Sequence, residues 1–184
     1  MAAMHIKVKQ RAMVRASALA FLLVAGATGF AASSKNASAG VYELKGQRLE
    51  ARFAVARGSL RVAWVKDLAS GAKLAPGEVF SLKLRDGRVI AASAMKLSTG
   101  PVEEAVTPIP AASRAAERVA GRRLCADLRT TDNSLSVRWC AVLREGANYL
   151  RQEVTLKAAS QPVDIAEVRL FDFDAPSAEV VGKV

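Results

Sequence analysis

The sequence predicts an all-β domain, an antiparallel β-sandwich, and three observations support this prediction. From Val41 onward, apolar and polar residues alternate with the period of two that is typical of half-buried strands. Two cysteines lie at the spacing of facing residues in one hairpin. Turn signals recur at the short intervals expected of sandwiches and barrels, as at Ser70-Gly71, Pro76-Gly77 and Asp86-Gly87.

The first 31 residues have the features of a cleavable signal peptide. Four basic residues precede an apolar stretch at residues 16–27, and the first forty residues contain no acid. This stretch is far shorter than the roughly 18–20 apolar residues of a membrane span, so we expect export without a stable transmembrane segment. A buried apolar helix is the disfavoured alternative. Small-x-small cleavage sequences occur at Gly29-Phe30-Ala31 and Ala37-Ser38-Ala39, and we expect cleavage after Ala31.

We expect the exported chain to be periplasmic or extracellular and to form one domain. Residues 32–40 are predicted to be a flexible N-terminus and residues 41–184 the β-sandwich, since roughly 150 residues suit a single core. Loss of the leader lowers the net charge from +10 to +6, because four of 27 Lys and Arg leave and all 17 Asp and Glu stay (27 − 4 − 17 = 6). The remaining basic residues are scattered rather than clustered, so a solvated surface is favoured over nucleic-acid binding.

The only histidine, His5, lies in the predicted signal peptide. A mature chain without histidine excludes Ser-His-Asp and Cys-His nucleophile activation, a histidine general base, and metal sites that need imidazole. Two cysteines cannot complete a zinc site, and no glycine-rich phosphate loop occurs. The sequence therefore predicts no catalytic residue, no metal and no cofactor.

The first two strands are expected at residues 47–57 and 60–68, on either side of Gly58. The apolar residues of each strand share one face: Leu49, Ala51, Phe53 and Val55 in the first, and Leu60, Val62 and Trp64 in the second. Further along, Asp86-Gly87 predicts a hairpin with a two-residue type I′ loop. The pairs predicted by that loop are Leu84–Val89 and Leu82–Ala91.

The middle of the chain has weaker patterns. Residues 99–113 contain three prolines and no sustained period, which predicts an irregular connection along a sheet edge. Residues 113–124 are rich in Ala, Arg and Glu, which favour helix, but Gly121 interrupts them and strands follow. We interpret this segment as strand or loop.

A hairpin that turns at residues 132–133 places Cys125 directly opposite Cys140. Its register pairs apolar residues on one face and Asp127 with Arg138 on the other, and this agreement fixes the register. A four-residue loop puts the cysteines at the closer, non-hydrogen-bonded ladder sites that favour a bridge, whereas a two-residue loop does not. We favour a structural disulfide over two free thiols. The apolar pairs are Leu124–Ala141, Ala126–Trp139 and Leu128–Val137.

The next hairpin is expected to turn at residues 145–146 with a two-residue loop. The pairs predicted by that loop are Val154–Val137 and Glu153–Arg138. Arg138 would then lie between two carboxylates, those of Asp127 and Glu153.

Side chains that could carry chemistry are few. Asp172 and Asp174 share one face of a strand and could act as acid and base or bind calcium, although any strand with a solvated face has the same spacing. Glu103 and Glu104 are adjacent residues in the expected connection. Three aromatic residues are candidate carbohydrate contacts, although core or rim positions are commoner for them: Trp64, Trp139 and Tyr149.

Two groups of short motifs indicate a family. One group is Arg138-Trp139, Leu143-Arg144, Gly146 and Asn148-Tyr149-Leu150-Arg151-Gln152. The other is Ser70-Gly71, Leu74, Pro76-Gly77, Phe80-Ser81-Leu82 and Asp86-Gly87. Together they resemble the N-terminal β-sandwich of secreted bacterial glycoside hydrolases related to α-galactosidases, including enterotoxin-like proteins.

The resemblance implies a sandwich of the galactose-mutarotase-like supersandwich type, followed by a (β/α)8 barrel that carries the catalytic carboxylates. Such a barrel takes about 250 residues and is an implied downstream partner, so no catalytic residue transfers to this chain. The implied role is the non-catalytic N-terminal portion of an exported hydrolase that acts on α-galactosyl or α-N-acetylgalactosaminyl glycans. The alternatives are a free-standing carbohydrate-binding module and a structural or adhesion protein of the bacterial envelope.

The end of the chain, AEVVGKV, has a strand-like pattern without a capping turn or polar tail. An apolar strand that stops in this way leaves a sheet edge unpaired. We therefore expect the sandwich to be truncated at its C-terminal end.

Overall fold

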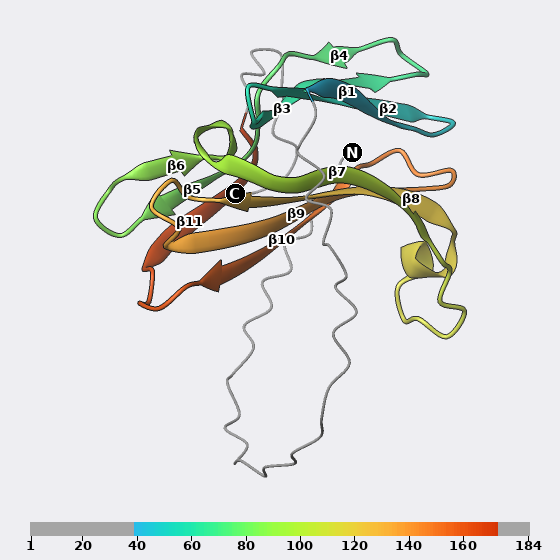
Figure 1. Cartoon of the computed structure of the whole chain (residues 1–184). Coiled ribbons are helices and arrows are strands. Elements are labelled where there is room, and N and C mark those ends of the chain that lie inside the picture. Colours follow the sequence, from blue (N-terminus) through green and yellow to red (C-terminus); the bar gives the residue numbers. More distant parts are fainter. Residues whose placement is uncertain (1–38, 173–184) are drawn as a thin grey trace, which may run out of the picture.

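The computed structural model describes residues 39–172, and this part of the chain is built from antiparallel sheets without an α-helix (Figure 1). Its strands are β1 (Gly40–Lys45), β2 (Leu49–Ala56), β3 (Ser59–Asp67), β4 (Lys73–Leu74), β5 (Glu78–Leu84), β6 (Val89–Ala91), β7 (Lys96–Val106), β8 (Gly121–Arg129), β9 (Leu135–Arg144), β10 (Arg151–Ala158) and β11 (Ile165–Asp172). Two short 3-10 helices precede β7 and β8, η1 (Ala92–Ala94) and η2 (Ala115–Arg118). No helix in the described residues is long and apolar enough to cross a membrane. The predicted signal peptide, Asp174 and the AEVVGKV segment lie outside these residues.

The described residues form three sheets, with strand orders β1-β2-β3-β4, β10-β9-β8-β7 and β11-β5-β6. Figure 1 shows the first sheet lying over the second, with the third at one end of the pair. A single cluster of buried side chains draws on all three sheets. The predicted all-β, antiparallel architecture is therefore confirmed, and its two facing layers are consistent with a β-sandwich.

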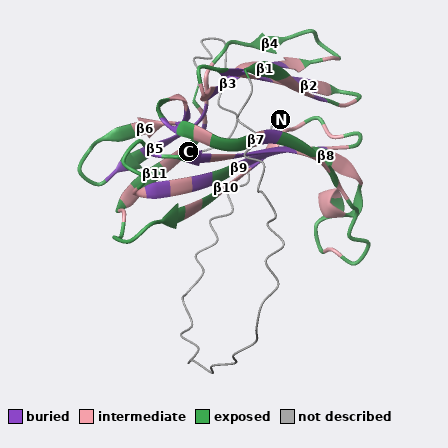
Figure 2. Ribbon diagram, viewed as in Figure 1, coloured by how far each residue is buried: buried purple, intermediate pink, exposed green. Residues whose placement is uncertain are grey.

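The centre of the core is an aromatic contact between the two facing sheets. Phe53 of β2 and Trp139 of β9 are completely buried, and their ring centroids lie 5.0 Å apart in an edge-to-face arrangement. Ala51 and Val55 are buried beside Phe53, which confirms the predicted core face of β2 (Figure 2). Such a ring pair adds about 0.5–1.5 kcal/mol to the stabilisation from burial itself.

The position of Trp64 differs from the prediction, which placed it on the core face with Val62. Arg52 of β2 pairs with Trp64, but the next residue, Phe53, pairs with Val62, so β3 contains one extra residue in a β-bulge. A bulge reverses the alternation beyond it. Val65 is therefore the next buried residue of β3, and Trp64 lies half-buried on the outer face.

The predicted hairpin at Asp86-Gly87 joins β5 to β6, but its register was wrong by one residue. The loop has three residues, because the Leu84 amide donates to the Arg88 carbonyl and the Gly87 amide donates to the Leu84 carbonyl. Only Gly87 has a positive φ (+89°) in this loop, whereas a type I′ turn needs two such residues. The observed pairs are Ser81–Ala91, Leu82–Ile90 and Lys83–Val89, in place of Leu82–Ala91 and Leu84–Val89.

The prediction of an irregular connection at residues 99–113 was wrong for residues 99–106, which belong to strand β7. This strand lies at the edge of its sheet, as expected, and its pairing with β8 shifts register twice between Leu97 and Val102. Pro101 lies within the shifted part, where an edge strand tolerates the missing amide donor. The segment interpreted as strand or loop is the short helix η2 followed by the start of β8.

The β8–β9 hairpin has the predicted register, in which Cys125 pairs with Cys140 and Asp127 with Arg138. The β9–β10 register was wrong by two residues. Glu153 pairs with Cys140 rather than Arg138, and Leu156 takes the predicted place of Val154 opposite Val137. Residues 145–150 separate the two strands, instead of the predicted two-residue loop. An even shift leaves each side chain on its predicted face.

Gly121 provides a test of the contact between β8 and β9. A Cβ atom at Gly121 would lie 2.5 Å from the Leu143 carbonyl oxygen, and the backbone there cannot move aside. The closest neighbour of a Cβ atom at Gly46 would be the Leu143 side chain, at 3.2 Å, and the nearest backbone atom, the Leu49 carbonyl oxygen, would lie at an ordinary contact distance of 3.7 Å. We expect Gly121→Ala to lower the free energy of unfolding by about 1–3 kcal/mol, in urea denaturation followed by tryptophan fluorescence. Gly46→Ala is the matched control, and equal losses in the two variants would contradict the proposed backbone clash.

Candidate functional site

Cys125 and Cys140 form a disulfide between β8 and β9, with their Cα atoms 4.1 Å apart. This separation belongs to the closer, non-hydrogen-bonded class of facing residues, as the four-residue loop predicts. The bridge lies on the face of the sheet opposite Trp139, yet both cysteines are buried. Its role is therefore structural.

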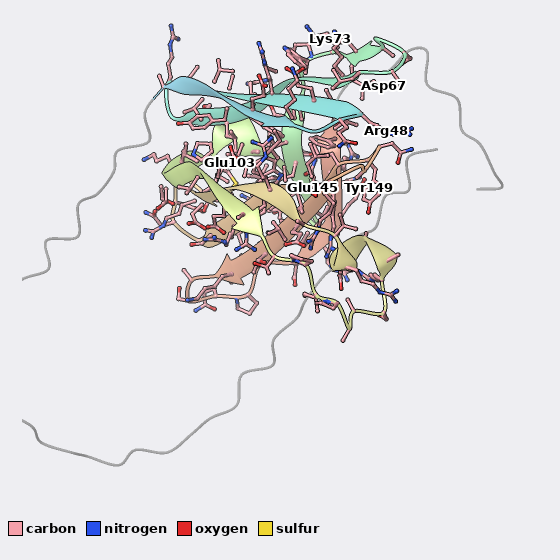
Figure 3. All side chains as sticks on the ribbon, turned by 90° about the vertical axis from the view of Figure 1, so that its right-hand side faces the viewer. Arg48, Asp67, Lys73, Glu103, Glu145 and Tyr149 are labelled. Carbon is pink, nitrogen blue, oxygen red and sulfur yellow. A yellow bond between two sulfur atoms is a disulfide. The ribbon has the colours of Figure 1, made fainter. Side chains whose placement is uncertain are left out.

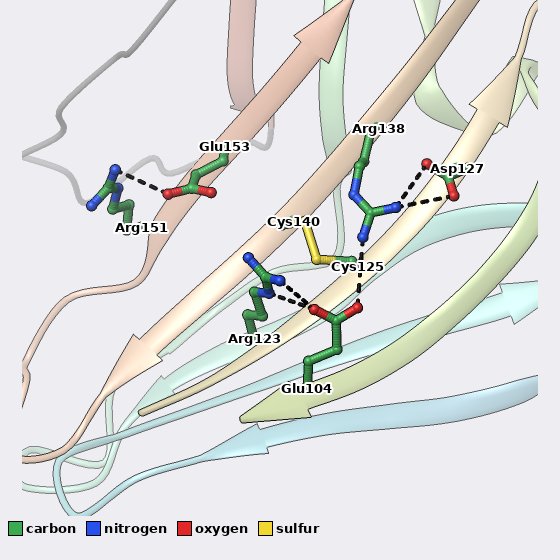
Figure 4. Close-up of a disulfide and its surroundings, with 8 residues drawn as sticks. All are labelled: Glu104, Arg123, Cys125, Asp127, Arg138, Cys140, Arg151 and Glu153. Carbon is green, nitrogen blue, oxygen red and sulfur yellow. Dashed lines mark hydrogen bonds and ion pairs between the residues drawn. A yellow bond between two sulfur atoms is a disulfide. The ribbon is translucent and has the colours of Figure 1, made fainter. Parts of the chain in front are cut away.

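Charged side chains surround the bridge (Figure 4). Arg138 lies between two carboxylates, as predicted, at 3.4 Å from Asp127 and 3.6 Å from Glu104. The prediction that Glu153 is the second partner was wrong. The β9–β10 loop is longer than predicted, so Glu153 lies opposite Cys140 instead of Arg138. Glu153 instead binds Arg151, at 2.9 Å. Exposed ion pairs of this kind contribute about 0–1 kcal/mol each, so we interpret the cluster as part of the framework.

The remaining acidic candidates are also held by neighbours. Glu103 and Glu104 lie in strand β7 rather than in a loop; Glu103 binds Arg122 at 3.0 Å, and Glu104 binds Arg123 and Arg138. The Ser81 hydroxyl donates to Asp172 at 3.0 Å. Within residues 39–172, no group of three His, Cys, Asp or Glu side chains is placed to hold a metal ion.

Every resolved pKa shift among the described carboxyl groups is downward. Hydrogen bonds from neighbouring amides, hydroxyls or an arginine stabilise the charged form in each case. A general acid at neutral pH needs the opposite, a raised pKa. The groups concerned are Asp67, Asp86, Asp132 and Glu167.

The three aromatic candidates lie in different environments. Trp139 is completely buried, so its ring has no surface for a ligand. Trp64 has the Arg52 guanidinium carbon 4.8 Å and the Lys73 ammonium 4.7 Å from its ring centroid, two cation–π contacts that a stacked sugar would have to displace. Tyr149 is half-buried in the loop between β9 and β10 (Figure 3).

Tyr149 lines a cavity of about 350 Å³, between η2, the start of β10 and the end of β11. This volume lies at the lower end of the range for small-molecule sites. The apolar part of its wall includes Leu150, Leu170 and the ring of Phe171. Aromatic and aliphatic groups together suit a ligand with an apolar face.

The polar part of the cavity wall contains two arginines, Arg114 and Arg151, and each is paired with a carboxylate. Arg151 donates to Glu117 at 3.3 Å and binds Glu153 at 2.9 Å, while Arg114 lies 3.8 Å from Glu117. Glu117 belongs to the wall and Glu153 lies outside it, so both guanidinium groups of the wall are already paired with carboxylates.

Gln152 completes the wall and has an unusual environment. Its side chain is only 6% exposed, and its Oε1 accepts a hydrogen bond from Trp139 Nε1 at 2.9 Å. Its Nε2 is buried without a hydrogen-bond partner among the described residues. An unpaired buried amide of this kind costs about 1–3 kcal/mol.

A second cavity, of about 710 Å³, lies between the β5–β6 turn, the β8–β9 turn and the β10–β11 loop. Asp132 on its rim stabilises the β8–β9 turn, since its Oδ1 accepts hydrogen bonds from the Ser134 amide and hydroxyl at 3.0 and 2.8 Å. Hydrogen bonds from the Thr130 side chain and from Ser134 lower the pKa of Asp132 to about 2. These contacts hold a turn, and we interpret the region as structural.

Sequence reasoning identified Tyr149 but not Gln152, Arg151 or Glu117 as neighbours of one cavity. A signal for Gln152 was present, because the period of two places this polar residue on the core face of β10, together with Val154 and Leu156. Comparisons of the chain with protein-family models, with curated proteins and with solved structures give no match. The site is therefore interpreted from its own geometry.

Replacement of both Cys125 and Cys140 by Ala should lower the free energy of unfolding by about 3 kcal/mol, the entropic value for a loop of 15 residues. Urea denaturation measures this loss. Dithiothreitol should destabilise the unmodified protein to a similar extent and leave the double variant unchanged. Two thiols open to alkylation in the native, unreduced protein would contradict the bridge.

Acid should weaken the β8–β9 turn through Asp132. Because its folded pKa of about 2 lies below the ordinary value of 3.8, the charged carboxylate stabilises the fold above the ordinary value, and this contribution disappears as the pH falls through the folded pKa. Asp132→Asn keeps an acceptor oxygen but cannot titrate. We therefore expect the unmodified protein to lose more stability than this variant between about pH 4 and pH 2 in acid–urea titrations. Equal acid dependence of both proteins would count against this role.

Proposed function

We propose that this chain is the non-catalytic N-terminal β-sandwich of an exported glycoside hydrolase-like protein that acts on α-galactosyl or α-N-acetylgalactosaminyl glycans. In this proposal the sandwich is of the galactose-mutarotase-like supersandwich type, residues 1–31 are a signal peptide, and a (β/α)8 barrel follows the domain. The disulfide supports export, because such bridges persist mainly in oxidising compartments.

The way the acidic side chains are bound is the observation that carries the non-catalytic part of the proposal. Glycosidases place two carboxyl groups about 5–9.5 Å apart on either side of a sugar, and the acid has a raised pKa. In the described chain, Glu104 and Asp127 neutralise arginines on the disulfide face, and Asp172 accepts a hydrogen bond from Ser81. None of these three carboxylates lines the cavity beside Tyr149.

The motif residues behind the family resemblance have structural positions, which supports a scaffold role for the β9–β10 hairpin. Trp139 forms the centre of the core and binds Gln152 across the hairpin. Gly146 has a φ of +68° in the connecting turn, which the Ala147 amide closes by donating to the Arg144 carbonyl. The hairpin thus organises packing and leaves Tyr149 at its surface.

The cavity beside Tyr149 favours a second candidate function, a free-standing carbohydrate-binding module. An aromatic ring next to planar polar side chains is a common arrangement for sugar contact. Both functions are non-catalytic for this chain. They differ in whether sugar binding needs a downstream barrel.

We expect the purified chain to release no aryl group from 4-nitrophenyl α-galactoside or α-N-acetylgalactosaminide, in absorbance assays against a buffer blank. The reason is that the described carboxyl groups with a resolved pKa shift all have a lowered pKa, whereas a general acid needs a raised one. Asp172→Asn serves as the control for trace hydrolase contamination, which this substitution would not remove. Turnover that Asp172→Asn abolishes would overturn the non-catalytic proposal.

A further inference from the structure

A buried donor group lies beside the cavity between η2, the start of β10 and the end of β11. Gln152 Nε2 is buried and lacks a hydrogen-bond partner among the described residues, and Gln152 is one of the side chains that line the cavity. Buried polar groups in native proteins nearly always have a partner, so an exception at a cavity indicates a missing acceptor.

The orientation of the Gln152 amide follows from its neighbour. The Trp139 indole nitrogen can only donate, so it requires the oxygen of Gln152, at 2.9 Å. The amide cannot be turned over without placing two donors against each other. Trp139 is completely buried and held against Phe53, so the nitrogen of Gln152 is held in one direction. Gln152 therefore holds a preorganised N–H donor beside the cavity that it lines.

The charge around the cavity restricts the ligand. Arg114 and Arg151 are already paired with Glu117 and Glu153, at 2.9–3.8 Å. An anionic ligand would have to separate these pairs, and a cationic one would meet two guanidinium groups. The wall therefore favours an uncharged ligand.

The volume and the lining of the cavity favour a ligand that is a ring with one apolar face. Tyr149 and Phe171 supply aromatic surface, Leu150 and Leu170 supply aliphatic surface, and the volume is about 350 Å³. A pyranose ring combines an apolar C–H face with oxygen acceptors at its edge, which matches both the aromatic wall and the Gln152 donor.

We propose that this cavity binds an uncharged pyranose residue of a glycan, with Gln152 Nε2 donating to one of its oxygens and Tyr149 against its apolar face. The choice of glycan rests on the proposed function, since the family resemblance supplies galactosyl units as the sugars to test. The amide of Gln152 and the ion pairs of the wall arginines are observations independent of that resemblance.

The test is a titration of the purified chain with methyl α-D-galactopyranoside and methyl N-acetyl-α-D-galactosaminide, followed by NMR of side-chain amides and by calorimetry. We expect saturable shifts of the Gln152 side-chain amide signals. Sodium galacturonate, the charged analogue, should bind more weakly. No shift of the Gln152 amide with either glycoside, or tighter binding of the galacturonate, would overturn the proposal.

Variants separate this cavity from other aromatic surfaces. Tyr149→Ala should weaken glycoside binding at least tenfold, whereas Trp64→Ala, the matched aromatic control on the outer face of β3, should leave binding unchanged. Gln152→Met keeps the side-chain length but removes the donor and should abolish binding. Loss of binding in Trp64→Ala, or unchanged binding in Tyr149→Ala, would also overturn the proposal.

The two proposals fail in different ways. A chain that hydrolyses aryl galactosides through Asp172 contradicts the non-catalytic function, whatever the cavity binds. A chain without turnover in which neither glycoside moves the Gln152 amide signals contradicts the cavity proposal alone and leaves the accessory-domain function standing.

Discussion

The indole of Trp139 is the group on which the rest of the described structure depends. Its ring packs edge-to-face on Phe53 and so joins the two facing sheets, while its N–H donates to Gln152 in the neighbouring strand. Both contacts need β9 in a single register, because a slip of one residue would turn Trp139 to the opposite face of the sheet. The same side chain therefore organises the core and sets the direction of the amide at the cavity.

Strand β9 separates two surfaces with different properties. On the face opposite Trp139, Cys140 is bridged to β8, and Arg138 is shared by Asp127 and Glu104 (Figure 4). Charge on that face is neutralised pair by pair, which suits a framework. On the core face, the apolar packing ends at Gln152, where a polar group lies beside an open cavity. The proposed binding role rests on this second surface.

The register of the β8–β9 hairpin was predictable because several signals required the same answer. The facing cysteines and the pair Asp127–Arg138 agree with the apolar alternation, and the structure has this register. Where only a turn signal was present, the hairpin was predicted but its loop length was wrong, as at Asp86-Gly87. Loop length depends on which backbone hydrogen bonds close the turn, and residue preferences constrain those bonds only weakly.

The strand content, most turn positions and the face of most side chains could be predicted from the residues alone, because these follow from a local period of two and from turn chemistry. The environments of Trp64 and Gln152 depend on tertiary packing. A bulge in β3 turns Trp64 outward to Arg52, and the packing of η2 and β11 around the start of β10 leaves a cavity at Gln152. The bulge depends on the pairing of β2 with β3, and the cavity depends on how elements distant in sequence pack together. No local pattern encodes either of them.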